Sequence, residues 1–582
     1  MVFSNNLLMG AAGQASGYEI DQSIRFNDDD SAFLARTPDA SNRKTWTWSA
    51  WVKRADLFNG SVPQILLSAG DGGTNDFIMQ FGQSDDTLRI SDYISSTQSN
   101  LITTQLFGDV SAWYHFVLAY DTTQGTAANR IKLYVNGSQV TAFGTETYPS
   151  ENQDLVINSA IAHNIGRGAY SSNGYFSGYM AEINFVDGTA LAPTAFGKTN
   201  DDGVWVPIKY AGAYGTEGYF IDGRDSSDLG DDESGNGNDF SSSGLAAADQ
   251  MPDTPTLNHW TLNPLDSGSG LANGNLQDLG GDSTHTHSPG FPITGKWYWE
   301  IVCTDINTGT AGAHFFAITD ASVAYSAGFS AAAAISAGTQ RGGQLKKNNS
   351  NTSTGTAIGD GDIVGMAFDA DNLTLDILVN NSASGSQITG LTASRYKIWI
   401  QNGAAVTNMT FNFAEASFEY TPPTGFKSLN TSNIPTPTIT DGSKYFQTTL
   451  YNGTGSELEV DQSGNSTFQP DFAWIKNRSN AGNEHDLYDA VRGATKVIFS
   501  STTSTESTQT QGLKSFDSDG FTVGTRGEVN TSGSTNVAWQ WLANNTTGST
   551  NDDGSVDSTV AANTTAGFSI CKLNPGGNSN IT

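Results

Sequence analysis

The sequence predicts an all-β protein built from serial antiparallel β-sandwiches. Of the 582 residues, 64 are Gly and only 15% are charged, while Ser, Thr and Asn are abundant. This composition is typical of many short strands joined by tight turns, and it excludes a helical bundle. Hydrophobic residues make up 37% of the chain, which is enough to fill several cores. A wholly disordered chain is therefore excluded.

Charge and apolar content limit the expected partners. Lys and Arg total 28 and Asp and Glu total 59, so the net charge is 28 − 59 = −31. Such a chain repels nucleic-acid phosphates and anionic lipid, and no basic run makes a local exception. No stretch approaches the ~20 apolar residues that span a bilayer. We therefore expect neither nucleic-acid binding nor membrane insertion.

The first predicted sandwich spans residues 21–200. In the segment Trp46-Thr-Trp-Ser-Ala-Trp-Val, every second residue from Trp46 to Val52 is apolar, the pattern of a half-buried strand. Apolar alternation also leads into Asn136-Gly137, a pair that is typical of a tight hairpin. The last strand of this unit is expected at Gly178-Tyr-Met-Ala-Glu-Ile-Asn-Phe-Val-Asp.

Two further units are predicted after a connecting region at residues 201–255. Residues 256–430 form the second sandwich, in which Trp297, Trp299 and Ile301 alternate along one strand. Residues 431–582 form a third β domain behind a proline-containing linker. The two cysteines, Cys303 and Cys571, fall in different domains, which excludes a disulfide framework and a cysteine-based zinc site.

Several motifs resemble known domains. Thr45-Trp-Thr-Trp-Ser-Ala-Trp-Val-Lys and Ile131-Lys-Leu-Tyr-Val-Asn-Gly resemble a laminin-G-like jelly roll of the concanavalin A type. Gly295-Lys-Trp-Tyr-Trp-Glu and Gly361-Asp-Ile-Val-Gly-Met-Ala-Phe-Asp resemble an SPRY-like sandwich. Asp471-Phe-Ala-Trp-Ile-Lys-Asn-Arg is similar to a module of marine tailed-phage appendage proteins. The serial arrangement resembles phage tail-fibre or virion-decoration proteins.

This resemblance implies a bacteriophage virion structural protein, a tail fibre or similar surface appendage that binds host surface glycan. Residues 1–20, with Asn5-Asn-Leu-Leu-Met-Gly-Ala-Ala-Gly, resemble the N-termini of that group and would attach to other virion proteins. A homo-oligomer is expected, with trimers the usual form of tail fibres. Relatives are expected to continue with more strands after Phe568-Ser-Ile-Cys, which leaves the completeness of residues 431–582 open.

Two alternative functions stay open. One is a capsid decoration protein of the same virus, and the other is a cellular glycan-binding adhesin or β-glucanase-like enzyme. The N-terminus has no Lys or Arg before its short apolar stretch, so it is a poor secretory signal. A protein released inside a virus particle by host lysis would need none.

The strongest enzymatic pattern is Glu182-Ile-Asn-Phe-Val-Asp187. Laminarinase-type glucanases carry Glu-x-Asp-x-Glu, or a bulged version of it, on one strand, so that alternation places a nucleophile and an acid on one face. Here Asn184 stands in the middle, and Asp187 is an odd number of residues from Glu182. Without a bulge the two carboxylates point to opposite faces. We therefore predict no enzymatic activity, no catalytic residue and no bound organic cofactor.

Two acidic loops are candidates for calcium. Clustered carboxylates, Asn side chains and loop carbonyls can supply the oxygens that calcium needs, although neither loop has the spacing of an EF-hand. A solvated turn is the simpler interpretation of both. The candidate ligands are Asp28, Asp29 and Asp30 in the first loop and Asp231, Asp232 and Asp239 in the second.

Histidine and aromatic residues give weaker signals. His285 and His287 would face the same way in an extended segment and could contribute to a shared metal site in a trimer, but exposed histidines in a polar loop are the simpler interpretation. Most tryptophans lie in alternating strands, where core packing is favoured over sugar stacking. The better candidates for exposed aromatic residues are Trp51, Tyr170 and Tyr175.

Overall fold

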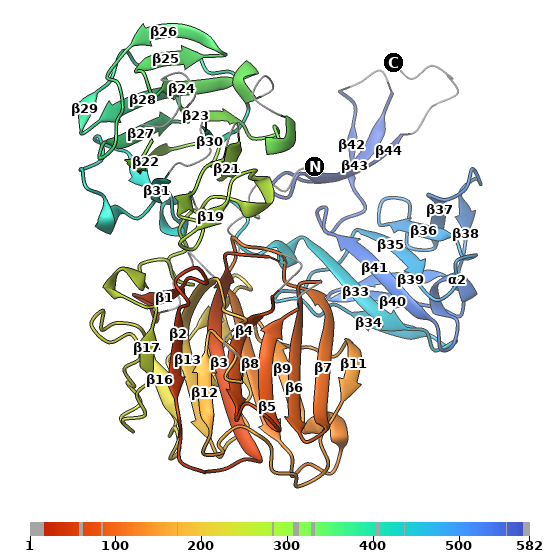
Figure 1. Ribbon diagram of the computed structural model, residues 1–582. Coiled ribbons are helices and arrows are strands. Elements are labelled where there is room, and N and C mark those ends of the chain that lie inside the picture. Colours follow the sequence, from red (N-terminus) through yellow and green to blue (C-terminus); the bar gives the residue numbers. More distant parts are fainter. Residues whose placement is uncertain are drawn as a thin grey trace. The chain divides into compact units, whose positions relative to one another are not determined.

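The computed structural model describes residues 17–57, 62–82, 85–170, 173–281, 284–306, 314–327, 332–402, 408–435, 437–553 and 556–573. This part of the chain is almost entirely β-structure (Figure 1), and its strand pairs are antiparallel except for one parallel pair in the second sandwich. The predicted all-β fold of serial antiparallel sandwiches is confirmed. The chain divides into two compact units, Met1–Lys198 with Trp205–Ile434, and Thr199–Val204 with Pro435–Thr582.

The first sandwich consists of two eight-stranded sheets. Sheet A has the order β10 (Ser138–Gln139), β9 (Ile131–Val135), β8 (Tyr114–Asp121), β3 (Thr45–Arg54), β13 (Gly178–Asp187), β1 (Ser23–Phe26) and β18 (Gln250–Met251), with β16 (Tyr219–Ile221) also on β13. Sheet B has the order β11 (Phe143–Thr147), β7 (Thr97–Leu106), β6 (Thr87–Ile94), β5 (Asn75–Phe81), β4 (Gln64–Gly70), β12 (Ala162–Ile165), β2 (Phe33–Arg36) and β17 (Ser241–Ser243).

The core of this sandwich follows the predicted alternation. Trp46, Trp48, Ala50 and Val52 of β3 are fully buried between the sheets. Phe77, Met79 and Phe81 of β5 alternate in the same way and meet them from sheet B. Trp46 stacks on the ring of Tyr120, with centroids 4.2 Å apart. Two aromatic-rich, alternating faces thus form one dry interior.

Residues 201–255, predicted as a connecting region, contribute strands to both sheets. Strand β16 pairs with β13 and strand β18 with β1 in sheet A, while β17 pairs with β2 in sheet B. The short apolar run Tyr219-Phe-Ile supplies buried side chains to the core. A separate ribbon is formed by β14 (Gly197–Thr199) and β15 (Trp205–Pro207).

The second sandwich also has two sheets. Sheet C has the order β19 (Leu271–Ala272), β20 (Gln277–Asp278), β31 (Asn408–Asn412), β22 (Lys296–Asp305), β27 (Ile363–Asp369), β28 (Thr374–Val379) and β29 (Ser382–Ala383), with β32 (Lys427–Ser428) parallel to β22. Sheet D has the order β21 (His285–Gly290), β30 (Tyr396–Gln401), β23 (Phe315–Asp320), β24 (Ser336–Gln340), β25 (Gln344–Lys347) and β26 (Ser350–Thr354). As predicted, Trp297, Trp299 and Ile301 point into the core.

A buried ion pair fixes the segment that leads from the first sandwich to the second. Lys53 of β3 is 1% exposed, and its ammonium lies 2.7 Å from Oδ2 of Asp253 and 2.7 Å from Oδ1 of Asn258. The indole nitrogen of Trp113 donates to the other Asp253 oxygen at 3.1 Å. Both charges are therefore paired and hydrogen-bonded, as burial requires.

The third domain contains three sheets and a short helix, α2 (Gly527–Asn530). Sheet E has the order β33 (Phe446–Asn452), β41 (Thr535–Trp541), β35 (Phe472–Asn477), β36 (His485–Asp489), β37 (Lys496–Phe499) and β38 (Ser507–Thr508). Sheet F has the order β34 (Leu458–Asp461), β40 (Gly520–Val523) and β39 (Leu513–Asp517), and sheet G the order β42 (Ser549–Asn551), β43 (Ser558–Asn563) and β44 (Phe568–Leu573).

The core of this domain lies between sheets E and F, where Ala473 and Ile475 meet Phe521 and Val523. The two cysteines are both free: Cys303 is buried in sheet C, and Cys571 is exposed on β44. Among the described residues, no helix combines the length and the hydropathy that a membrane span requires.

Candidate functional site

The outer face of sheet A is closed by its own chain. The ring of Trp51 stacks on that of His115 at 4.6 Å, and Trp205 donates its indole N–H to Nδ1 of His115 at 3.0 Å. Phe196 packs on the neighbouring side chains of the same face. The prediction that Trp51 is exposed is wrong, since it is 1% exposed. Alternation correctly placed Trp51 outside the core, but a second layer of side chains from the same chain covers it.

Glu182 lies at a β-bulge in β13. The register with β3 shifts between Ala181 and Asn184, and Glu182 adopts a left-handed backbone conformation with φ of 51°. Tyr18 donates to its carboxylate at 2.9 Å. Burial is the main cause that raises the pKa of Glu182 to about 7. Glu182 lines, together with Ser49 and His115, a space too small for a water molecule.

Asp187, at the end of the same strand, lies beside a different pocket. It accepts hydrogen bonds from the side chain of Asn158 at 2.9 Å and from the backbone N–H of Glu217 at 3.2 Å, and also from the Ser41 hydroxyl. The bulge therefore does not bring Glu182 and Asp187 together. The paired carboxylates of a glycosidase need a common face and a gap of a few ångströms for substrate.

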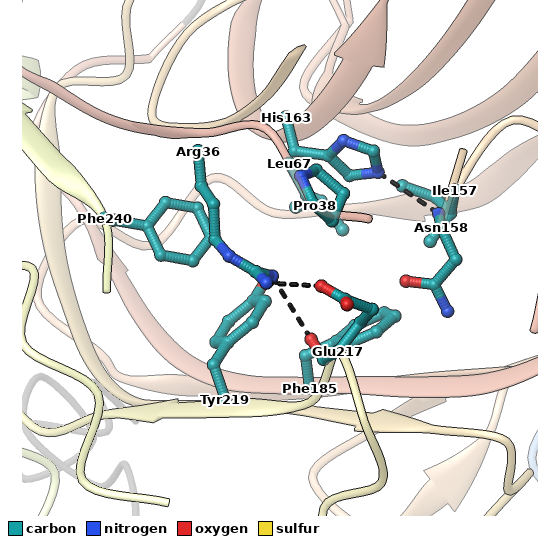
Figure 2. Close-up of a pocket in the computed structure, with 10 residues that line it drawn as sticks. All are labelled: Arg36, Pro38, Leu67, Ile157, Asn158, His163, Phe185, Glu217, Tyr219 and Phe240. Atoms are coloured by element: carbon teal, nitrogen blue, oxygen red, sulfur yellow. Dashed lines mark hydrogen bonds and ion pairs between the residues drawn. The ribbon is translucent and has the colours of Figure 1, made fainter. Parts of the chain in front are cut away.

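The pocket beside Asp187 is filled by a polar network (Figure 2). Arg36 points toward Glu217, pairs with its carboxylate and donates to its carbonyl at 3.3 Å, between the rings of Tyr219 and Phe240. On the other side, the ring of His163 accepts from the backbone N–H of Asn158 at 3.2 Å. The remaining space holds about one water molecule, which excludes a sugar.

The outer face of sheet B, in contrast, carries exposed aromatic rings beside polar groups. The strand register aligns Tyr93 of β6, Asp76 of β5 and Gly70 of β4 in one row. Tyr170 lies directly over Gly70, where a Cβ atom would come within 3.0 Å of the Tyr170 Cβ. Tyr93 is 42% and Tyr170 41% exposed. We call Tyr93, Asp76 and Tyr170 the tyrosine row.

Asp76 is the polar centre of the tyrosine row. Burial raises its pKa to about 7, with further contributions from Asp71 and Asp92. Its Oδ1 atom is shielded from solvent and accepts no hydrogen bond from the described residues. Gln80 and Arg89 lie opposite each other further along the same two strands and are half-exposed. This face therefore offers ring surfaces, a half-exposed carboxyl group and donors at its edge.

The loop that carries Tyr170 is held in place by neighbouring side chains. The Arg167 guanidinium lies over the ring of Phe33 at 4.1 Å and near that of Tyr175 at 5.7 Å. The Ser68 hydroxyl donates to the carbonyl of Arg167 at 2.6 Å. Tyr170 is thus exposed as predicted, whereas Tyr175 is only half-exposed.

The first predicted calcium loop forms a turn. The Asn27 amide donates to Asp30 at 2.7 Å, and the Ser31 N–H donates to the Asp28 carbonyl at 3.0 Å. Burial and the neighbouring Asp29 raise the pKa of Asp28. Burial, Asp28 and Asp29 also raise the pKa of a further carboxyl, that of Asp56, to about 6. A cation bound here would neutralise this repulsion.

In the second predicted calcium loop, the Asp232 carboxylate accepts hydrogen bonds from backbone N–H groups. One oxygen accepts from the Phe220 N–H at 2.8 Å and the other from the Asn238 N–H at 2.9 Å. Asp239 accepts from the Asp232 N–H at 3.1 Å, and Asp231 is half-exposed. Among the described residues, one acidic cluster has ligand atoms within 4.8 Å of one another, and it lies elsewhere: Glu459, Asp461 and Asp519.

The histidine pair is buried, so the prediction of an exposed loop is wrong. His285 and His287 lie in β21 and are 8% and 0% exposed. His285 accepts from the indole N–H of Trp399 at 3.1 Å, and Nδ1 of His287 lies 3.0 Å from Asp266. The polar sequence Thr-His-Thr-His-Ser is part of strand β21, which pairs with β30.

Two family models match parts of the chain. Residues 26–194 match the concanavalin A-like lectin/glucanases superfamily, in its laminin-G form, and residues 441–582 match a domain of unknown function (DUF7483). The first sandwich is thus a concanavalin A-like domain. No curated protein matches the chain.

Solved structures are similar to parts of the chain. A pentraxin from Limulus polyphemus is 16% identical, with a TM-score of 0.23, over 30% of this chain and 78% of the pentraxin. The SPRY domain of human HERC1 is 16% identical, with a TM-score of 0.23, over 26% of this chain and 96% of that domain. Domain 4 of an arabinanase from Geobacillus stearothermophilus, solved with arabinotriose, is 18% identical, with a TM-score of 0.21, over 27% and 67%.

Sequence reasoning identified Tyr170 but missed Tyr93 and Asp76. The signal was present: Phe77, Met79 and Phe81 alternate inward, so Asp76 must point outward on the same strand. Leu88 and Ile90 fix the phase of β6 in the same way and place Tyr93 outside. What the sequence does not reveal is which strands are neighbours.

Proposed function

We propose that this protein is a structural protein of a bacteriophage particle, a tail fibre or similar appendage, whose concanavalin A-like domain binds host surface saccharide through the tyrosine row. It binds the saccharide without cleaving it. Each contact is shallow and weak, and several copies on one particle raise the overall avidity.

The observation that carries the saccharide proposal is the tyrosine row itself. Aromatic ring faces pack against the apolar faces of sugar rings, and carboxylates accept hydrogen bonds from sugar hydroxyl groups. Tyr93 and Tyr170 flank Asp76, whose carboxyl group is half-exposed. The row lies on the open sheet face of a domain that matches a lectin and glucanase superfamily.

The test is saccharide binding by the full chain and two variants, Tyr93→Ala and Tyr170→Ala, on an array of bacterial surface polysaccharides. Each substitution removes an exposed ring and should weaken binding about tenfold, equivalent to about 1.4 kcal/mol. Tyr325→Ala is the matched control, because Tyr325 is 38% exposed in the second sandwich. Equal binding by all four proteins would contradict the proposal.

The absence of cleavage is supported by the separation of Glu182 and Asp187 into different pockets. Incubation with laminarin tests it directly, and we expect no release of reducing ends. Hydrolysis that Glu182→Gln abolishes would contradict this part of the proposal.

The place on the particle is supported by the resemblance of the serial domains to phage appendage proteins. Cryo-electron microscopy of purified particles would separate a tail fibre from a capsid decoration protein. Density for these sandwiches on the tail is the expected result, and density on the head would favour the decoration protein.

A further inference from the structure

One side of sheet E in the third domain is rich in aromatic and aliphatic side chains, although it does not face the core. Alternation sends Ala473 and Ile475 into the core, so their neighbours on β35 point outward. The strand register places the outward side chains of three adjacent strands together. We call this surface the aromatic face: Phe446, Leu450, Phe472, Trp474, Trp539 and Trp541.

The aromatic face is incompletely covered. Leu450 is 62% and Phe446 40% exposed, and the tryptophans are half-exposed. Ile498, on β37 of the same side, is 39% exposed. Large apolar side chains that are grouped and exposed in this way mark an interaction surface.

The chain already uses part of this face for packing. Phe568 of β44 stacks on Trp541 with ring centroids 5.9 Å apart, and lies 6.1 Å from Phe472. On the other side of Trp541, the ring of Phe446 follows at 4.8 Å and continues the same row. The exposed part of the face is therefore continuous with an interface that the protein itself forms.

Strand β44, which supplies Phe568, is itself short of partners. Among the described residues it pairs with β43 alone, so its other edge is free. Leu573 at its end is 46% exposed. An edge strand beside an apolar face offers both backbone and side-chain contacts to another chain.

Charge on this side of sheet E is compatible with a second copy, because Lys476 lies in the row of Leu450 and copies of the chain are acidic. The chain as a whole has a net charge of −31, so copies repel each other over most of their surface. In the row that contains Phe472, the acidic residue is Asp489, which is 4% exposed and lies 2.5 Å from Arg492. Contact through the aromatic face would thus bury apolar area of two copies without burying unpaired carboxylates.

The ring geometry of this face is that of a packed aromatic cluster. Trp474 and Trp539 meet at 63°, and Phe472 and Trp541 at 60°. Edge-to-face and tilted pairs of this kind are a preferred arrangement of packed aromatic rings. We propose that the aromatic face, with the adjoining edge of β44, binds a second copy of this chain.

Analytical ultracentrifugation of the full chain over a concentration series tests this proposal. The unmodified protein should form a concentration-dependent oligomer. Leu450→Lys and, separately, Ile498→Lys should each weaken association at least tenfold, because a charge would be buried in the interface. Leu106→Lys is the matched control, since Leu106 is 61% exposed in the first unit, and it should leave association unchanged. Circular dichroism of each variant is the control for folding.

Three outcomes would overturn the proposal. The first is that the unmodified protein stays monomeric at every concentration. The second is that Leu450→Lys and Ile498→Lys associate as well as Leu106→Lys. The third is that a monomeric protein loses polysaccharide binding when Leu450 is substituted. The inference goes beyond the proposed function and is separable from it, because Tyr93→Ala and Tyr170→Ala should leave the oligomer intact.

Discussion

At the scale of single residues, Glu182 is a buried carboxyl group in a constrained backbone conformation. It is 6% exposed, occupies a left-handed conformation at the bulge and accepts a hydrogen bond from Tyr18. Burial favours its neutral form, so its pKa rises from 4.5 to about 7. The folded protein therefore holds a proton at Glu182 that the unfolded chain releases above pH 4.5.

This proton gives stability a defined pH dependence. Because the pKa of Glu182 is higher in the folded state, its contribution to the stability of the fold is fully present below the unfolded-state pKa of 4.5. That contribution is lost as pH rises through the folded-state pKa of about 7. Denaturant unfolding of the unmodified protein should show a loss of up to about 3 kcal/mol between pH 4.5 and pH 8 from this group. Glu182→Gln should remove that component, while exposed Glu19→Gln should keep it. An unchanged pH profile in Glu182→Gln would contradict the assignment.

At the scale of elements, the ion pair between β3 and the segment after β18 should be worth much more than a surface pair. Asp253→Ala leaves the Lys53 ammonium 1% exposed and without its counter-charge, and should cost about 3–5 kcal/mol in the free energy of unfolding. Asp154→Ala removes an exposed partner of Lys44 at 3.9 Å and should cost at most about 1 kcal/mol. Equal midpoints in urea would refute the difference.

The sequence predicted elements better than it predicted their surroundings. Period-two alternation identified the buried faces of β3 and β22, because every second side chain must share one face. It failed for Trp51, which lies on the other face of its strand, and for His287, which lies in a polar run. Both are buried by segments distant in sequence, such as the one that carries Trp205. Local pattern contains no information about such covering layers.

The candidate site illustrates the same limit. Tyr170 could be selected as an exposed ring in a polar loop, but its relation to Asp76 and Tyr93 depends on the order of strands β4, β5 and β6. That order is set by the packing of the whole sandwich. Gly70 matters for the same reason, since a Cβ there would lie 3.0 Å from the Tyr170 Cβ and 3.3 Å from its backbone nitrogen, closer than an ordinary contact.

At the scale of the whole molecule, net charge should control association. With a net charge of −31, repulsion between copies extends over about 10 Å at 0.1 M salt and is screened further as salt rises. We expect sodium chloride to tighten the oligomer, because apolar contacts at the aromatic face are not weakened by screening. Sedimentation at low and high salt measures this, and dissociation by salt would mean that ion pairs hold the copies together.

The unequal burial of the two sulfur atoms has a practical consequence. The Cys303 thiol is enclosed in sheet C, and burial raises its pKa, whereas Cys571 stands in solvent on β44. A maleimide dye added to the native protein should therefore react at one position per chain, and no cysteine has to be introduced. Because Cys571 lies on β44, slower labelling at high protein concentration would report burial of that strand between copies.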